Sequence, residues 1–150
     1  PGVISDHDLE TSWNTFIQEL QENPLYKAFM QEVLGLEEWT VRFAWHRGQK
    51  GNEVSPHVDN SDKIATHIFY FNTDQDWNAS WGGDILVLGD KLTPEKNPEF
   101  EDFGTVSSVP ILNNRSFLFK NTPQSWHGVK ALQCPENKYR NLFNVIYGKK

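Results

Sequence analysis

The most restrictive feature of this sequence is a change of pattern at Trp39. Before it, apolar residues recur at three- and four-residue steps, which predicts an amphipathic helix from Asp8 to about Leu20 with Leu9, Trp13, Phe16, Ile17 and Leu20 on one face. A second helix is expected from Asn23-Pro24 to Gly35, because asparagine caps helices, proline suits the first turn and glycine favours helix ends. After Trp39, short β-branched and aromatic segments alternate with turn residues, which predicts strands.

Eight such segments follow one another, a number that suits a jelly roll. We place them near residues 39–46, 52–58, 64–72, 83–88, 105–111, 115–120, 125–131 and 139–147. The predicted fold is therefore mainly β with N-terminal helices, a double-stranded β-helix of the cupin-like type with the helices packed on one face. A chain of 150 residues favours a single domain, with helices at about 6–35 and a jelly-roll core at about 39–148.

Charge and cysteine content limit the expected classes of binding partner and the expected cellular location. The net charge is −6 without a run of Lys or Arg, so neither nucleic acid nor an anionic membrane is expected as the main partner. The single cysteine, Cys134, has no internal partner, and neither a signal-peptide pattern nor a membrane-length apolar stretch is seen. We expect a cytoplasmic, reducing location. Nothing in the sequence specifies an oligomeric state.

The segment His57-Val58-Asp59 offers two metal ligands. On an extended strand, residues two apart project from the same face, so the imidazole and the carboxylate can meet one ion. A second histidine, His127, lies on the predicted seventh strand, which in a jelly roll can pair with the second strand. Two His and one carboxylate on one side of a metal leave positions open, as in non-haem Fe(II) oxygenases. Taken alone, the pattern also fits three unrelated polar residues.

The predicted last strand carries an arginine that this metal hypothesis can use. Alternation places four side chains on one face, and these are Arg140, Leu142, Asn144 and Ile146. If that face is the interior, a guanidinium lies inside the barrel and requires an anionic partner, for which a dicarboxylate is well suited. An outward-facing surface arginine is the alternative reading of Arg140 by itself.

Taken together, the ordered motifs resemble a known family. They are His57-x-Asp59, Thr66-His67-Ile68-Phe69-Tyr70-Phe71-Asn72, Gly82-Gly83-Asp84, Arg115-Ser116-Phe117-Leu118-Phe119, His127-Gly128-Val129 and Arg140. This order, over about Val41 to Tyr147, resembles the prolyl 4-hydroxylase-like branch of the Fe(II)/2-oxoglutarate dioxygenases. The resemblance implies an enzyme that couples oxidative decarboxylation of 2-oxoglutarate to succinate with hydroxylation of a substrate C–H bond. It implies Fe(II) as metal, 2-oxoglutarate and O₂ as co-substrates, and ascorbate as a candidate reductant.

The resemblance also assigns roles to individual residues. It implies that His57, Asp59 and His127 are the catalytic Fe(II) ligands and that Arg140 pairs with the distal carboxylate of 2-oxoglutarate. Tyr70 matches a family tyrosine that helps to hold the same carboxylate. Side chains on the same faces are expected to line this pocket, and they are Thr66, Ile68, Val129 and Ile146. Tyr70 as an ordinary core aromatic fits the pattern equally well.

Two features depart from the family pattern. The tyrosine common on the first core strand is replaced around Trp45-His46, and the spacing to His57 leaves its counterpart ambiguous by one residue. This puts a second polar contact to 2-oxoglutarate in question. The interval from His127 to Arg140 is also longer, and we expect residues 133–137 to form an extended hairpin turn.

The substrate and two other classes of protein stay open at this stage. Peptidyl proline is the first expectation from the resemblance, and a free amino acid or small metabolite is the second, because fold does not fix substrate. Loops at about 48–54, 74–81 and 90–101 are expected to frame the entrance. The same triad would suit a zinc- or cupin-type enzyme. A jelly-roll binding module that stacks sugars on aromatics is a third reading, with Trp45, Trp77, Trp81 and Trp126 as the stacking residues.

Overall fold

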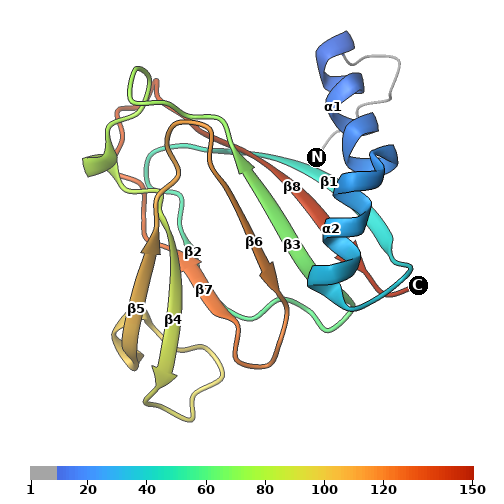
Figure 1. Cartoon of the computed structure of the whole chain (residues 1–150). Helices are drawn as coiled ribbons and strands as arrows, with labels where there is room; N and C mark the ends of the chain where they lie inside the picture. Colours follow the sequence, from blue (N-terminus) through green and yellow to red (C-terminus); the bar gives the residue numbers. More distant parts are fainter. Residues whose placement is uncertain (1–9) are drawn as a thin grey trace. The chain divides into compact units, whose positions relative to one another are not determined.

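The computed structural model describes residues 10–150 and shows two compact units, one ending at Glu38 and the other comprising Trp39–Lys150. The first contains helix α1, Thr11–Glu22, and helix α2, Pro24–Leu34 (Figure 1). The expected helix start near residues 6–8 lies outside the described residues. Within residues 10–150, no helix has the length and apolarity needed to cross a bilayer.

The ends of α2 confirm the predicted capping. The side-chain oxygen of Asn23 accepts hydrogen bonds from the backbone N–H groups of Leu25 and Tyr26, at 2.9 and 3.3 Å. These bonds satisfy two donors that a helix N-terminus leaves without intrahelical partners. Gly35 ends the helix with φ 70°, a left-handed conformation that glycine adopts at little cost.

Eight strands make up the second unit, as the turn spacing predicted. They are β1 Thr40–Gly48, β2 Val54–His57, β3 Lys63–Tyr70, β4 Ile85–Lys91, β5 Phe103–Val109, β6 Ser116–Lys120, β7 Trp126–Val129 and β8 Arg140–Gly148. Two short 3-10 helices, η2 Ala79–Trp81 and η3 Phe100–Asp102, interrupt the loops. Each strand overlaps its predicted segment, which confirms the mainly β assignment.

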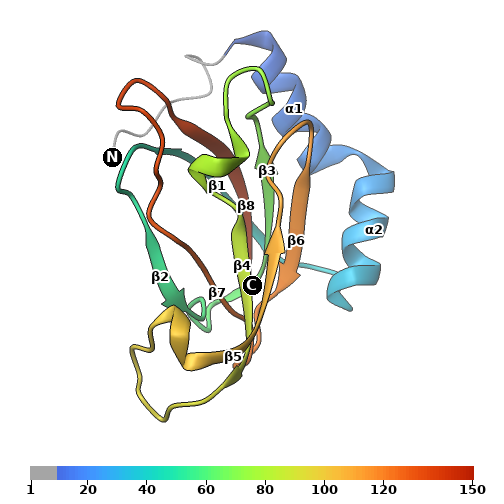
Figure 2. The same ribbon diagram turned by 90° about the vertical axis from the view of Figure 1, so that its left-hand side faces the viewer.

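The strands form two four-stranded antiparallel sheets, with orders β1-β8-β3-β6 and β2-β7-β4-β5. Consecutive strands therefore lie mostly in different sheets, and the chain crosses repeatedly between the layers, as Figures 1 and 2 show. This is the double-stranded β-helix, or jelly roll, predicted from the sequence. Its two inner faces enclose a space that can hold a ligand.

The pairing of β2 with β7 is the register on which the site depends. His57 lies directly opposite His127, and Val54 lies opposite Val129, with an irregularity between the two pairs. Side chains opposite each other in a sheet share a face, so both imidazoles point the same way. This confirms the expected approach of the seventh strand to the second.

The two faces of the β1-β8-β3 region differ in character. One face carries aromatic rings, and Phe143 stacks on Phe43 with 5.6 Å between ring centroids. Trp45 packs edge-on against Phe143 at 5.5 Å and also contacts Phe71. The other face carries Arg140 and its alternation partners toward the second sheet. Register therefore separates an aromatic outer face from an inner face that carries both apolar side chains and the polar side chains Arg140 and Asn144.

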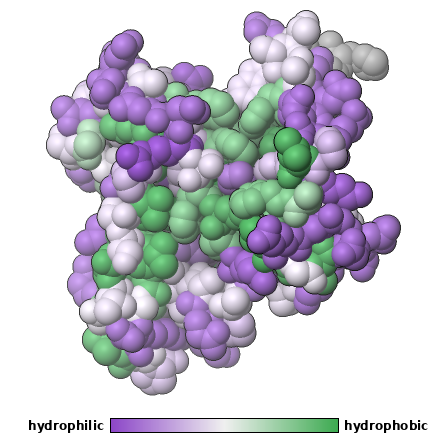
Figure 3. All heavy atoms as spheres, in the orientation of Figure 1, coloured by the Kyte–Doolittle hydropathy of each residue, from purple (hydrophilic) through white to green (hydrophobic). Residues whose placement is uncertain are grey.

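Apolar side chains gather toward the centre of the view in Figure 3, with hydrophilic side chains around the margins. Two exposed apolar residues, Val87 on β4 and Val106 on β5, lie on neighbouring strands of the second sheet, of which β5 is an edge strand. Polar side chains are uncommon in the apolar interior, and a buried polar side chain requires a hydrogen-bond partner or a chemical role.

The segment 130–139 corrects one expectation. β7 and β8 belong to different sheets, so this segment crosses between sheets and is no hairpin turn. Leu132 and Cys134 are buried, at 2% and 1% exposure. Backbone hydrogen bonds join Gly51 and Asn52 to Leu132, which fixes the crossing against the β1–β2 connection. The segment between His127 and Arg140 is thus packed against the rest of the fold.

Gly128 provides a test of the β2–β7 contact. A Cβ atom there would lie 2.7 Å from the carbonyl oxygen of Val54 and 3.0 Å from the ring of Phe100, and backbone cannot easily move away. We expect Gly128→Ala to lower the free energy of unfolding by about 1–3 kcal/mol in chemical denaturation, because overpacking strains the strand pair. Val106→Ala, at an exposed position, should change it by less than about 1 kcal/mol. Equal stability of Gly128→Ala and the parent would show that the contact is looser than described.

Candidate metal centre and adjoining pocket

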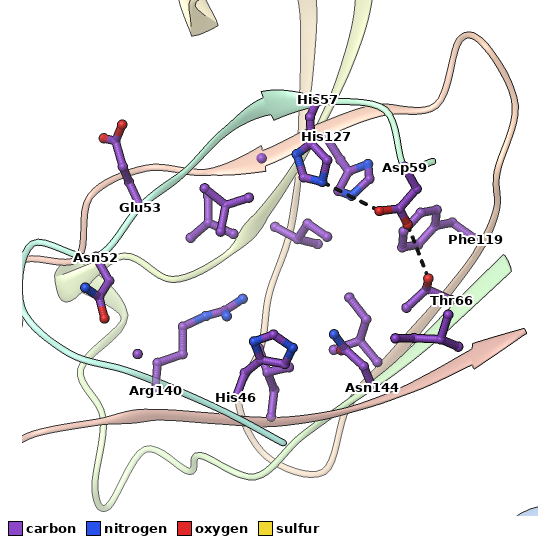
Figure 4. A pocket seen from close by; sticks show the side chains of 18 of the residues that line it. His46, Asn52, Glu53, His57, Asp59, Thr66, Phe119, His127, Arg140 and Asn144 are labelled. Carbon is purple, nitrogen blue, oxygen red and sulfur yellow. Dashed lines mark hydrogen bonds and ion pairs between the residues drawn. The ribbon is translucent and has the colours of Figure 1, made fainter. Parts of the chain in front are cut away.

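Three predicted ligands converge at one end of the pocket. Ligand atoms of His57, Asp59 and His127 all lie within 4.8 Å of one another, and the two imidazole centroids are 4.3 Å apart (Figure 4). His57 ends β2, His127 lies on β7, and Asp59 follows His57 by two residues. Within residues 10–150 no other group of three His, Cys, Asp or Glu side chains meets this description. Two imidazoles and one carboxylate form a facial ligand set of the kind that non-haem iron uses.

Both histidines use the same ring nitrogen, Nδ1, for a hydrogen bond to the backbone. Nδ1 of His57 lies 3.0 Å from the Ser55 carbonyl oxygen, and Nδ1 of His127 lies 2.9 Å from that of Ser125. A carbonyl oxygen only accepts, so each Nδ1 donates its proton and each Nε2 keeps a lone pair. Such backbone partners orient metal-binding histidines and fix their tautomers. The local sequence thus prepares both Nε2 atoms as ligands.

The charge of Asp59 is strongly favoured. Burial by itself would raise the pKa of this carboxyl, but His57 and the Lys63 ammonium beside it hold the pKa well below its usual range. Lys63 Nζ lies 2.8 Å from Oδ1, and Thr66 Oγ1 donates to Oδ2 at 3.4 Å. The contact between the Asp59 carboxylate and the His57 ring also raises the pKa of His57 above its ordinary value, although burial of the ring acts in the opposite direction. An ionised carboxylate is what a divalent cation requires.

The pocket continues from the triad to Arg140. Its volume is about 650 Å³, within the range of sites that enclose small molecules. Eight of the nine predicted site residues line it, namely His57, Asp59, Thr66, Ile68, His127, Val129, Arg140 and Ile146. The ninth, Tyr70, is absent from the wall but is buried, at 3% exposure, with its ring centroid 5.5 Å from the Arg140 guanidinium carbon. The strand alternation predicted from the sequence is confirmed.

Arg140 is held by a backbone hydrogen bond to its Nε atom. Its Nε donates to the Gly83 carbonyl oxygen at 2.7 Å, and its exposure is 8%. Gly83 adopts φ +101°, and a Cβ there would lie 3.1 Å from the Arg140 Cδ atom, so glycine permits this close approach. The Tyr70 hydroxyl is buried without a hydrogen-bond partner, and burial raises the pKa of Tyr70 to about 12. A neutral hydroxyl donor and a buried guanidinium together suit a carboxylate.

Among the pocket residues that were not predicted as site residues, three carry basic side chains close to the predicted ones. Arg42 and His46 alternate on β1 toward the pocket, and Lys63 begins β3. The ambiguity at Trp45-His46 is resolved, because Trp45 packs on the aromatic outer face and His46 lines the pocket. Burial, followed by the charges of Arg140 and Lys63, lowers the pKa of His46. The alternation along β1 was the signal that could have identified this residue.

One of the three loops expected to frame the entrance contributes to the pocket wall. Gly48, Asn52, Glu53 and Val54 line the pocket, whereas no residue of 74–81 or 90–101 does so. Phe100 of the latter loop lies against Gly128. Trp77 is buried at 2% exposure, and its Nε1 donates to the Gly82 carbonyl oxygen. Trp126 packs on Phe103 at 5.6 Å. None of the four tryptophans lines the pocket as a sugar-stacking residue would.

Comparisons with known proteins agree with this geometry. Residues 42–146 match the model of the 2OG-Fe(II) oxygenase superfamily. No curated protein matches the sequence. A prolyl-4-hydroxylase from Pseudomonas putida is similar in structure, with a TM-score of 0.64 and 16% identity over 97% of this chain and 70% of that one.

Two other solved structures share the fold. One is a prolyl hydroxylase from Trichoplax adhaerens in complex with a peptide fragment of the hypoxia inducible factor oxygen degradation domain, with a TM-score of 0.51 and 19% identity over 73% of this chain and 43% of that one. The other is the alpha ketoglutarate dependent epimerase SnoN from nogalamycin biosynthesis, with a TM-score of 0.52 and 16% identity over 89% and 57%. The chain thus spans about half the length of these two proteins.

The chain belongs to the 2OG-Fe(II) oxygenase superfamily. It is an Fe(II)- and 2-oxoglutarate-dependent dioxygenase with a jelly-roll fold. The residues present fit these groups, since the triad supplies an iron-type donor set and the buried Tyr70 hydroxyl beside Arg140 lacks the partner that a carboxylate would provide.

The triad makes a direct prediction. We expect His57→Ala, Asp59→Ala or His127→Ala to abolish measurable Mn(II) binding in anaerobic calorimetry, because two ligands hold a labile divalent ion poorly. Asp62→Ala removes a carboxylate three residues from Asp59 but outside the cluster, so its affinity should equal that of the parent. Parent-like Mn(II) affinity in all three triad variants would move the metal site elsewhere.

Proposed function

We propose that this enzyme hydroxylates a C–H bond of its substrate, with Fe(II) held by His57, Asp59 and His127 and with 2-oxoglutarate anchored by Arg140. The observation that carries the proposal is that the triad and Arg140 line one pocket. A dicarboxylate in this pocket would meet the metal held by the triad at one end and the Arg140 guanidinium at the other. When bound, iron and 2-oxoglutarate supply the oxidising chemistry, in which the 2-oxo acid becomes succinate and CO₂ and one oxygen atom of O₂ enters the substrate.

The protein's part is to bind, orient and exclude water. Arg140 and Tyr70 would hold the distal carboxylate, the guanidinium through charge-assisted hydrogen bonds and the phenol through one further bond. Gly83 takes the Nε–H of Arg140, which leaves the other guanidinium N–H groups for the ligand. The apolar wall between the two ends contains Ile68, Ile85 and Leu142. A largely dry pocket strengthens these electrostatic contacts and limits side reactions.

Two further polar groups extend the proposed co-substrate site. Asn144 lines the pocket, and its side-chain oxygen is buried without a hydrogen-bond partner. His46 lines the pocket from β1, and its lowered pKa favours the neutral ring. A neutral imidazole can both donate and accept a hydrogen bond, as tyrosine can, so His46 would fill the position of the family tyrosine. Both residues are ready to contact 2-oxoglutarate or the substrate.

Peptidyl proline is the proposed substrate by similarity to prolyl hydroxylases, one of which was solved with a peptide. Hydroxylation of a free amino acid or small metabolite is the second candidate, and the concave pocket of about 650 Å³ favours it. A zinc hydrolase or a sugar-binding module would have no use for Arg140 and Tyr70 together at one end of the pocket.

Arg140 is the residue whose loss should affect 2-oxoglutarate most. We expect Arg140→Ala to weaken 2-oxoglutarate binding to the Mn(II)-loaded protein by about 2–5 kcal/mol, because it removes charge-assisted hydrogen bonds to a desolvated carboxylate. Tyr70→Phe should act in the same direction but less. Mn(II) affinity should change little in either variant. Arg115→Ala, an exposed arginine outside the pocket, is the control, and unchanged 2-oxoglutarate affinity of Arg140→Ala would place the anchor elsewhere.

Anaerobic addition of Fe(II) and then 2-oxoglutarate tests the proposed function itself. Direct chelation of ferrous iron by a 2-oxo acid should produce a weak visible charge-transfer band, because an electron can be excited from the metal to the bound ligand. On admission of O₂, succinate should form, and a proline-containing peptide or an amino acid should gain the mass of one oxygen. A folded, iron-loaded protein without the band and without succinate would contradict the proposal.

A further inference from the structure

The pocket carries more positive charge than 2-oxoglutarate requires. The chain as a whole has a net charge of −6, yet the pocket wall contains Arg42, Arg47, Lys63 and Arg140 against the carboxylates of Glu53 and Asp59. The proposed co-substrate uses Arg140 alone among these cations. The other basic side chains are therefore available to bind a second anionic group. This inference rests on the proposed function.

Lys63 is the basic residue nearest to the metal ligands. Its Nζ lies 2.8 Å from Asp59 Oδ1, and its side chain is 24% exposed against 9% for Asp59. The side-chain amide of Asn121 donates to the carbonyl oxygens of Asp59, Asn60 and Lys63 at 3.2, 2.8 and 3.1 Å. One side chain thus fixes the backbone from residue 59 to residue 63. The lysine is held at the metal centre by the fold.

The Lys63 side chain lines the pocket at the triad end. Its Nζ is paired with Asp59, and both residues line the pocket together with His127 on β7. His46 on β1 lines the same pocket from the other sheet. Lys63 is therefore part of the wall to which both sheets contribute.

The acidic partner of Lys63 is the same carboxylate that the metal needs. A divalent cation bound at the triad would interact with the Asp59 carboxylate more strongly than the singly charged Lys63 ammonium does. The two cations would also repel each other, because they share one carboxylate. Glu53 is the other carboxylate on the wall, and the structure shows no ion pair between it and Lys63 among the described residues. A partly buried ammonium that loses its counter-ion is costly until another anion arrives.

A second cation lies at the same end. Across the sheet, Arg42 on β1 faces Ile146 on β8, and Ile146 faces Thr66 on β3, so Arg42 and Thr66 share one row of the pocket wall. The only ion pair shown for Arg42 in residues 10–150 is with Asp62 at 3.5 Å, and both side chains are mostly exposed, at 58% and 68%. Exposed pairs of this kind contribute little and exchange readily.

We propose that Lys63, with Arg42 behind it, binds a carboxylate of the substrate at the triad end of the pocket. The substrate is then an acid as well as a C–H donor. Its carboxylate would come from the α-carboxyl group of a free amino acid or from an acidic side chain next to the oxidised residue of a peptide. Because Lys63 contacts Asp59, the oxidised carbon lies close to this carboxylate along the substrate.

Matched pairs of acids and amides test the proposal without turnover. The parent protein, loaded with Zn(II) and saturated with 2-oxoglutarate, is titrated in calorimetry with acetate and acetamide, with L-proline and L-prolinamide, and with acetylated proline peptides that carry Asp or Asn beside the proline. We expect the acid of at least one pair to bind about tenfold more tightly than its amide. Preference in the proline pair identifies a free amino acid, and preference in the peptide pair identifies an acidic peptide.

Variants assign the preference to Lys63. Lys63→Met should make acid and amide equal, Lys63→Arg should retain most of the preference, and Lys96→Met, an exposed lysine of the 90–101 loop, should behave as the parent. Thermal unfolding and Zn(II) affinity are measured first for each variant. If Lys63→Met no longer binds Zn(II), Arg42→Met takes its place, because the ion pair of Arg42 is with Asp62, outside the triad, and it should reduce the preference by a smaller factor.

The outcomes separate the two proposals. A parent that binds acids and amides equally, or binds none of them, overturns the carboxylate site, as does a preference that persists undiminished in Lys63→Met and Arg42→Met. If the Fe(II)–2-oxoglutarate band forms while the acid preference is absent, only this inference fails. If the band itself is absent, the proposed function fails as well.

Discussion

The pairing of β2 with β7 is the constraint on which the rest of the site depends. It places His57 opposite His127, and the backbone carbonyls two residues earlier hold both rings through Nδ1. Asp59 joins them because it follows His57 by two residues. Gly128, beside His127, allows β7 to lie close to Val54 on β2. A slip of one residue in this pair would turn one imidazole to the opposite face.

Charge is distributed unevenly along the pocket, and this asymmetry orients what enters it. At one end, Arg140 is held by Gly83 and lies beside the unpartnered hydroxyl of Tyr70, so that end presents donors to an anion. At the other end, Asp59 and Lys63 form an ion pair beside two imidazoles, and that end accepts a cation. Burying such groups is costly, and a fold retains them where a ligand compensates the cost.

Much of this arrangement could be predicted from the sequence. Alternation placed Arg140 on the inner face, and strand order brought His127 to His57. The choice between Trp45 and His46 was left open because a one-residue shift along β1 exchanges the pocket face for the aromatic face, although the alternation of side chains along this strand separates the two. The position of Lys63 beside Asp59 could not be predicted from the sequence pattern. Their contact depends on a turn that is held by hydrogen bonds from Asn121, which lies in a distant part of the chain. The crossing segment 130–139 was misread because turn residues look alike in hairpins and in packed connections.

The assignment of the metal and co-substrate sites can be tested by a crystal structure of the protein with Mn(II) and 2-oxoglutarate, grown without oxygen. We expect an anomalous manganese peak within bonding distance of His57 Nε2, His127 Nε2 and an Asp59 carboxylate oxygen. We also expect 2-oxoglutarate to chelate this ion and to extend along the pocket, with its distal carboxylate on the Arg140 guanidinium. Manganese bound away from the triad, or a distal carboxylate that does not reach Arg140, would contradict this assignment.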